Sequence, residues 1–248
     1  MTYCLAISVD DGLVFASDSR TNAGVDYVAT YSKMSRFVFD DNRVLVLLTS
    51  GSLATSQAVV NAIKRDLDDP ESEFDISQGK YLHEVAQYIG KLSQHEQQIH
   101  GEAFEKSNSS NESSFILGGQ IKGQPCEIYL IYPQGNFISA SAETPYLQIG
   151  ESKYGKPILD RIISADISLS DAARCAVISL DSTMRSNVSV GPPIELTLHK
   201  RDIFQPPEHL VLSATSDDYQ SIQAQWNNGI KSAFSQLPKL DWDKYNRY

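Results

Sequence analysis

The chain has 248 residues, 41% of them hydrophobic and 21% charged, which is ordinary for a globular protein and enough for one large domain. Its net charge of −10 disfavours a nucleic-acid partner, because acidic surfaces repel phosphates. No apolar run approaches the roughly 18 residues of a membrane-spanning helix, and no signal peptide is indicated. Three scattered cysteines without metal-binding spacing are typical of a cytoplasmic protein: Cys4, Cys126 and Cys175.

Two hairpins are predicted in the first fifty residues. Residues 3–8 and 13–17 are apolar runs around the turn Asp10-Asp11-Gly12, and both are apolar enough to be buried on two faces. Before the second hairpin we expect a polar bend at 20–24 and an extended stretch at 25–34. That hairpin has strands at 36–39 and 43–48 and a turn at 40–42.

From Ser52 onward, apolar residues recur at helical spacing. Ser52 is a suitable N-cap, and the first helix is predicted to end at 66–70. Residues 102–114 are polar and predict an exposed loop. The remaining predicted helices are 81–99, 154–163, 168–184 with a Ser168 cap, and 217–236. The remaining predicted strands are 115–121, 126–132, 137–142, 194–199 and 209–213, and an aromatic, charged tail follows from 238.

The order of these elements predicts the fold class. Helices occur in pairs between blocks of hairpin strands and do not follow every strand, which favours an α+β sandwich of two antiparallel sheets with helices outside. No linker-like change in composition divides the chain, so one domain over residues 1–248 is expected. The apolar helix residues Val59, Ile63, Leu82 and Ile89 are either core or subunit contacts.

Several familiar catalytic motifs are missing. His95 and His100 are five residues apart, whereas a zinc-binding helix needs two histidines four apart on one face. We find neither a Gly-x-Ser-x-Gly elbow nor a phosphate-binding loop. We therefore expect neither a metal nor an organic cofactor.

Thr2 offers a different chemistry. If Met1 is removed, Thr2 carries both a hydroxyl nucleophile and an α-amine, whose reference pKa of about 7.7–8.0 suits a base near neutral pH. Lys33 would favour the uncharged amine, Asp18 would orient Lys33, and the Gly51 N–H would stabilise an oxyanion. The structural alternative is that Thr2 merely follows Met1, Lys33 is solvated, and Asp18 caps a turn.

These residues carry a family resemblance. Thr2, the run from Gly12 to Thr21, Lys33 and Thr49-Ser50-Gly51 resemble the N-terminal half of a proteasome β-type subunit, an N-terminal nucleophile hydrolase. Asp18 lies 16 residues after Thr2 and Lys33 lies 31 after, one fewer than usual, a deletion that we place at 20–24. Residues 15–26 and 149–157 are most similar to the bacterial Anbu (ancestral β-subunit) branch.

The resemblance implies a four-layer αββα sandwich of two antiparallel sheets flanked by helices, with a C-terminal extension from about residue 206. It also implies self-assembly into a ring-like or helical homo-oligomer and a peptide or polypeptide substrate, and it leaves open whether an unfoldase partner exists. Catalysis would use Thr2, Asp18 and Lys33, with Gly51 at the oxyanion. Further site residues would support these groups (Ser189, Ser152, Arg20 and Asn187) or bind substrate (Thr21 and Asn22).

Two segments depart from the family pattern. Gly150-Glu151-Ser152 replaces a Gly-Ser-Gly segment, and which residue takes the role of its serine is open. Residues 185–191 stand where the family has an Arg-Asp-x-x-Ser-Gly segment. This chain lacks the aspartate of that segment and has Ser186 or Asn187 near its position. We predict a cytoplasmic threonine peptidase. The alternatives are a small-amide amidase of the same superfamily and a non-catalytic assembly subunit.

Overall fold

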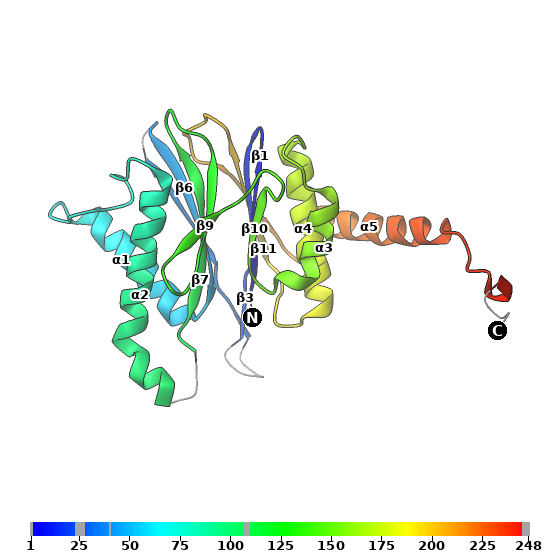
Figure 1. Ribbon diagram of the computed structural model, residues 1–248, viewed down its shortest axis with the longest axis horizontal. Coiled ribbons are helices and arrows are strands. Elements are labelled where there is room, and N and C mark those ends of the chain that lie inside the picture. The colour runs from blue at the N-terminus through cyan, green and yellow to red at the C-terminus, as the bar shows by residue number, and fades with distance from the viewer. Residues whose placement is uncertain (1, 23–27, 40, 107–109, 245–248) are drawn as a thin grey trace.

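Two five-stranded antiparallel sheets stack face to face, and helices cover both outer faces (Figure 1). The computed structural model describes residues 2–22, 28–39, 41–106 and 110–244. Some residues lie outside this description: Met1, residues 23–27, Asp40, residues 107–109 and residues 245–248. They include the end of the bend predicted at 20–24, the first residue of the turn predicted at 40–42, and parts of the predicted loop at 102–114 and of the tail from 238. The four layers confirm the α+β sandwich.

The first sheet combines strands from both ends of the chain and packs against helices from the C-terminal half. Its strands, in spatial order, are β10 (Tyr146–Gly150), β1 (Tyr3–Val9), β2 (Gly12–Asp18), β11 (Ile194–Lys200) and β12 (Glu208–Leu212). Two helices cover its outer face, α3 (Ser152–Ile162) and α4 (Leu169–Ser186), and Ser168 caps α4 as predicted.

In the second sheet, the spatial order of the strands follows their order in the sequence. In spatial order these are β5 (Met34–Phe39), β6 (Arg43–Gly51), β7 (Ser113–Ile121), β8 (Glu127–Ile131) and β9 (Phe137–Ser139). Helices α1 (Leu53–Asp68) and α2 (Leu82–Lys106) cover it, and their residues Val59, Ile63, Leu82 and Ile89 are buried against the sheet. These four are therefore core residues and not subunit contacts. A small ribbon, β3 (Arg20–Asn22) with β4 (Val28–Thr30), follows β2.

The alternation of side chains along β1 explains why its sequence is apolar throughout. Leu5 and Ile7 belong to the cluster between the first sheet and α3–α4, whereas Cys4 and Ala6 belong to the cluster between the two sheets. Both faces of a central strand are covered in a four-layer sandwich, so neither face can be polar. The prediction of two-sided burial for the first two strands is confirmed.

Three elements differ from the sequence-based expectation. Residues Arg20–Asn22 of the bend expected at 20–24 form strand β3, which pairs with β4. Helix α2 continues to Lys106, so the predicted loop at 102–114 is wrong over its first residues. Glu, Ala and Lys after Gly101 are good helix formers and sustain the helix. Strand β10 is absent from the sequence-based expectation, because it is short and its partner β1 lies far away in sequence, with Tyr3 opposite Gly150 and Ile7 opposite Tyr146.

Helix α5 (Asp217–Ser235) projects from α4 away from the sandwich (Figure 1), and a 3₁₀ turn (Trp242–Lys244) follows it. Its first turn is anchored, because the buried Tyr219 hydroxyl donates to the Asp181 carboxylate of α4 at 2.8 Å. Among the described helices, none is both long and apolar enough to cross a bilayer.

Candidate active site

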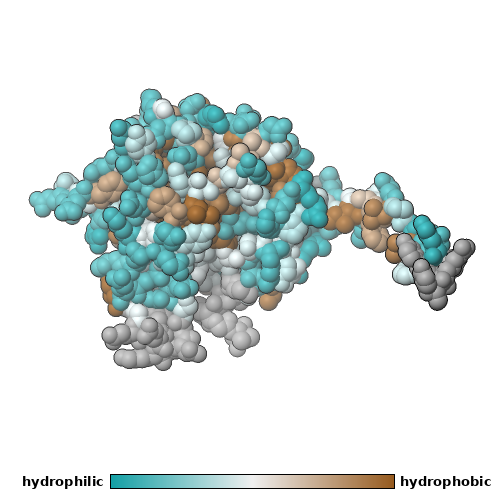
Figure 2. Space-filling model, viewed as in Figure 1, coloured by the Kyte–Doolittle hydropathy of each residue, from teal (hydrophilic) through white to brown (hydrophobic). Residues whose placement is uncertain are grey.

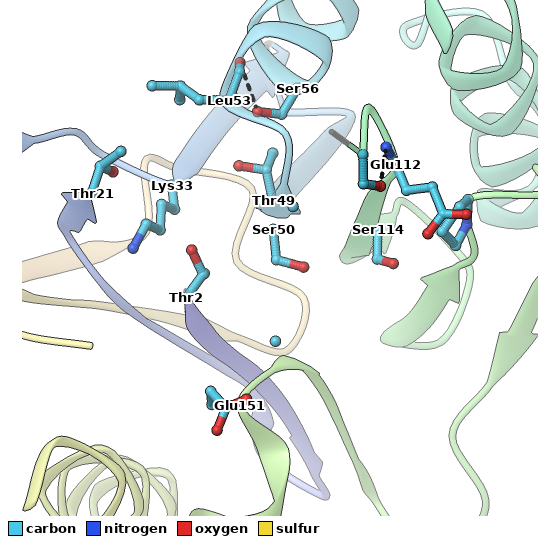
Figure 3. A pocket seen from close by; sticks show the side chains of 14 residues that line it. Thr2, Thr21, Lys33, Thr49, Ser50, Leu53, Ser56, Glu112, Ser114 and Glu151 are labelled. Carbon is cyan, nitrogen blue, oxygen red and sulfur yellow. Dashed lines mark hydrogen bonds between the residues drawn. The ribbon is translucent and has the colours of Figure 1, made fainter. Parts of the chain in front are cut away.

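Thr2 lies at the rim of a pocket of about 660 Å³ at one end of the sandwich (Figure 3). The ends of β1, β6 and β10 meet there, so residues from three separate parts of the chain share one wall. Of the predicted site residues, four line this pocket: Thr2, Thr21, Lys33 and Gly51.

The backbone of Thr2 is held from two sides. The Glu151 N–H donates to the Thr2 carbonyl at 2.8 Å, and the next N–H, that of Tyr3, donates to Asp18 Oδ1 at 3.0 Å. Gly150 makes this approach possible, since a Cβ at that position would lie 1.9 Å from the Thr2 carbonyl oxygen. Gly150 also has φ +83°, a conformation that favours glycine. The position of Thr2 is therefore fixed by main-chain contacts.

Asp18 is the centre of the polar network behind Thr2. Its side chain is fully buried and accepts from Lys33 Nζ at 2.6 Å, from the Tyr3 N–H at 3.0 Å and from the Gly191 N–H at 3.1 Å. Burial raises the pKa of Asp18, while Lys33 and the two N–H donors favour its charged form. One carboxylate thus joins the start of β1, the loop before β5 and the loop before β11.

Lys33 is only 5% exposed, which is unusual for a lysine. Its ammonium donates to Asp18 and, also at 2.6 Å, to the Arg20 carbonyl, and its own carbonyl accepts from the Thr49 N–H at 3.0 Å. Figure 3 shows the Lys33 side chain reaching toward the space in front of the Thr2 hydroxyl. The structural alternatives, a solvated Lys33 and an Asp18 that only caps a turn, do not hold.

Gly51 ends β6 and has φ +100°, and a Cβ there would lie 2.3 Å from the Glu112 carbonyl oxygen. The chain therefore turns from β6 into α1 only with glycine at this point. Ser52 accepts from the Thr55 N–H and caps α1, as predicted. Gly51 and Thr2 both line the pocket.

The loop after α4 supports this site from behind. Asn187, the C-cap of α4, is buried and its side-chain oxygen accepts from the Ser189 N–H at 2.9 Å, whereas Ser186 is exposed. Of the two candidates near the missing aspartate, Asn187 is thus the one inside the structure. Arg20 donates to the Val188 carbonyl at 2.7 Å and so ties β3 to the same loop.

Ser152 does not line the pocket. Ser152 begins α3, and its neighbour Glu151 lines the pocket in its stead (Figure 3). Asn22 lies opposite Val28 in the ribbon of β3 and β4, next to Thr21.

Sequence reasoning missed several pocket residues: Thr49, Ser50, Ser56, Glu112, Ser114 and Glu151. Glu112 and Ser114 come from the start of β7, whose register against β6 places Ser113 opposite Gly51. Only the pairing of β6 with β7 would have revealed them. Thr49, Ser50 and Glu151 lie in segments that the family resemblance singles out, but no role was assigned to them.

Comparisons with known proteins agree on the family. A model of the proteasome subunit family matches residues 2–198. A search of curated proteins finds no match.

Three solved structures cover almost the whole chain. Anbu (ancestral beta-subunit) from Yersinia bercovieri is 41% identical with a TM-score of 0.89, covering 97% of this chain and 99% of its own. A helical assembly of the Anbu complex from Pseudomonas aeruginosa is 41% identical with a TM-score of 0.88, covering 96% and 98%. An Anbu (Gly-1) mutant from Hyphomicrobium sp. strain MC1 is 39% identical with a TM-score of 0.90, covering 97% and 100%.

Proposed function

Because this chain belongs to the proteasome subunit family, in its Anbu branch, we propose that it is a threonine peptidase whose nucleophile is Thr2 after removal of Met1. The observation that carries the proposal is the buried Lys33–Asp18 pair, which lies directly behind a Thr2 held by its own backbone. A buried ion pair is costly to maintain, and Lys33, the cation of this pair, lines the same pocket as Thr2.

The proposed reaction begins with the Thr2 hydroxyl, which attacks the carbonyl carbon of a peptide bond. The Thr2 α-amine takes the hydroxyl proton, directly or through one water, and the Gly51 N–H donates to the oxyanion. The C–N bond then breaks, the amine returns the proton to the leaving group, and Thr2 is left as an ester. Water hydrolyses this acyl-enzyme by the same steps and restores the free hydroxyl.

Lys33 supports the amine in this scheme. A positive charge beside an amine disfavours its protonated form and keeps more of it available as a base at neutral pH. Asp18 fixes the Lys33 ammonium and is itself fixed by the Tyr3 and Gly191 N–H groups. Asn187, Ser189, Arg20 and Ser152 act as supporting residues around these groups, and Thr21 and Asn22 border the path of an extended substrate.

The proposed enzyme assembles with further copies of itself, as the Anbu complex of Pseudomonas aeruginosa does in its helical assembly. We assign the assembly contact to the extension from about residue 206, which carries α5. The three cysteines are free thiols, which suits a cytoplasmic location.

The proposal is tested with purified wild-type protein, a Thr2→Ala variant and a Thr2→Ser variant. Intact mass spectrometry first establishes that Met1 is absent. The expected result is hydrolysis of fluorogenic peptides by wild type, a reduced rate for Thr2→Ser, and a loss of at least about 1,000-fold for Thr2→Ala. An unchanged rate in Thr2→Ala, or retention of Met1 in an active protein, would refute the mechanism. A panel of small amides assayed in parallel distinguishes a peptidase from an amidase.

A further inference from the structure

A second pocket adjoins the one that holds Thr2. It has a volume of about 360 Å³ and lies between α1 and the segment that leads into β5. The two pockets share the lining residues Lys33, Thr49, Leu53 and Ser56. The two pockets are therefore continuous. When the carbonyl group of a substrate residue lies at Thr2, the side chain of that residue can enter the side pocket.

The wall that α1 contributes to the side pocket is mostly polar. Gln57, Asn61 and Lys64 are spaced four and three residues apart, which places them on one face of the helix. Ser35 borders the opposite side, on the edge strand β5. A lining of amide, hydroxyl and ammonium groups favours a polar side chain over an aliphatic one, because an aliphatic group would leave these groups without hydrogen-bond partners.

The charge of this lining is positive. Lys64 has no ion-pair or hydrogen-bond partner among the described residues, and no carboxylate lines the side pocket. Lys33, the other cation there, is already paired with Asp18. Ser32 donates to the buried Glu195 at 2.9 Å, and that carboxylate lies outside the lining.

The pocket that contains Thr2 has the opposite character away from Lys33. Glu112 and Glu151 line it (Figure 3): Glu112 lies beside the N-cap of α1, where its carbonyl accepts from the Ser52 N–H at 2.9 Å, and Glu151 precedes α3. The Thr2 pocket therefore carries two carboxylates that the side pocket lacks, and the side pocket carries the Lys64 ammonium that the Thr2 pocket lacks. This difference in charge favours the side pocket over the Thr2 pocket as the place where a substrate carboxylate binds.

We propose that the side pocket receives a carboxylate side chain, Asp or Glu, of the residue whose carbonyl is attacked. This inference rests on the proposed hydrolase function and names its substrate class. Lys64 is then a specificity-determining residue and takes no part in bond breaking. Its ammonium forms an ion pair with the substrate carboxylate, while Gln57 and Asn61 donate amide hydrogen bonds.

The test compares four fluorogenic peptides that differ only in the residue before the leaving group: Glu, Gln, Leu or Lys. At low ionic strength we expect kcat/KM for the Glu peptide to exceed that for the Gln peptide by about fivefold, the upper range for a solvent-accessible ion pair. Lys64→Ala should make the two rates equal, Lys64→Glu should favour the Lys peptide, and Lys64→Arg should keep the original order. Lys91→Glu, a charge reversal at an exposed lysine of α2, is the matched control and should change no preference.

A preference for Leu, or a ratio of Glu to Gln that Lys64→Ala leaves unchanged, would overturn the proposal. Cleavage of none of the four peptides would overturn it as well. The hydrolase function is judged separately, by the mass increase at Thr2 after treatment with a neutral β-lactone. Labelling of Thr2 with no acidic preference would refute the substrate class alone, and no labelling would refute both.

Discussion

Asp18 joins three parts of the chain through one carboxylate. The Lys33 ammonium and two backbone N–H groups all donate to it, and none of these partners is close to it in sequence. Desolvation makes a buried ion pair costly, and removing one partner is more costly still because it leaves the other charge buried and uncompensated. The proposed catalytic pair is thus also a structural element.

This leads to a prediction for Lys33→Met. Loss of the ammonium leaves Asp18 buried without its counter-charge, so the free energy of unfolding should fall by about 3–5 kcal/mol in urea titrations. The double variant Asp18→Asn/Lys33→Met removes both charges and should recover part of that stability. Neither variant should hydrolyse peptides, because the terminal amine has lost its neighbouring charge. A Lys33→Met protein as stable as wild type would show that Lys33 does not stabilise the buried Asp18 carboxylate.

His199 provides a second prediction at this scale. Its side chain is 1% exposed, and burial lowers the pKa of His199 to about 4, against about 6.5 in an unfolded chain. Below pH 6.5 the unfolded state therefore binds a proton that the folded state does not. The stability that depends on neutral His199 is present above pH 6.5 and is lost as the pH falls toward 4.

The measurement is urea unfolding of wild type and His199→Asn at pH 7 and pH 4.5. Wild type should lose about 2 kcal/mol more than the variant between these two values. His83→Asn, at an exposed histidine of α2, should behave like wild type. Equal pH dependence of wild type and His199→Asn would show that His199 is protonated in the folded protein.

At the scale of the elements, the ends of strands decide the geometry of the site. Gly150 at the end of β10 and Gly51 at the end of β6 both have positive φ, and both bring backbone within reach of the pocket. Strand β10 positions Thr2 through a direct main-chain contact, although the two lie at opposite ends of the first 150 residues. The site therefore depends on the pairing of β10 with β1.

Gly150→Ala tests that dependence. The added Cβ would meet the Thr2 carbonyl oxygen, so Thr2 must shift and hydrolysis should fall by at least about 100-fold. Gly123→Ala is the matched control, because Gly123 has φ +81° but no atom within 4 Å of the added Cβ. The control should lose about 1 kcal/mol of stability in urea and keep full activity. Equal activity of the two variants would show that β10 does not position Thr2.

At the scale of the whole molecule, the extension from β12 onward stands apart. Apolar side chains on α5 and beyond it are open to solvent, with Phe234 at 73%, Leu237 at 61% and Trp242 at 69% exposed. Figure 2 shows this end as a projecting arm with brown, apolar residues along it. Such an arm is costly for an isolated chain, because exposed apolar patches favour association.

We therefore expect Phe234→Glu/Leu237→Glu to prevent self-assembly while the sandwich stays folded. Native mass spectrometry should show oligomers for wild type and mainly single chains for the double variant, with unchanged circular dichroism. Gln225→Glu/Asn228→Glu adds the same charge at exposed polar positions of α5 and should assemble as wild type does. Oligomers of unaltered size in the Phe234 and Leu237 variant would exclude the arm as the contact.

The sequence by itself determined the layers and the first catalytic candidates. Apolar alternation and cap residues such as Ser52 and Ser168 are local signals, since a helix or hairpin is specified by neighbours within a few residues. The spacing of Thr2, Asp18 and Lys33 supported the family resemblance, and the structure brings these residues together.

Only the tertiary structure decided which residues surround Thr2, Asp18 and Lys33. Strand β10, the entry of Glu112 and Glu151 into the pocket, and the choice of Asn187 over Ser186 all arise from contacts between residues far apart in sequence. The side pocket with Lys64 likewise exists only where α1 faces β5. Such contacts depend on strand register and on helix packing over a sheet, which no short stretch of sequence specifies by itself.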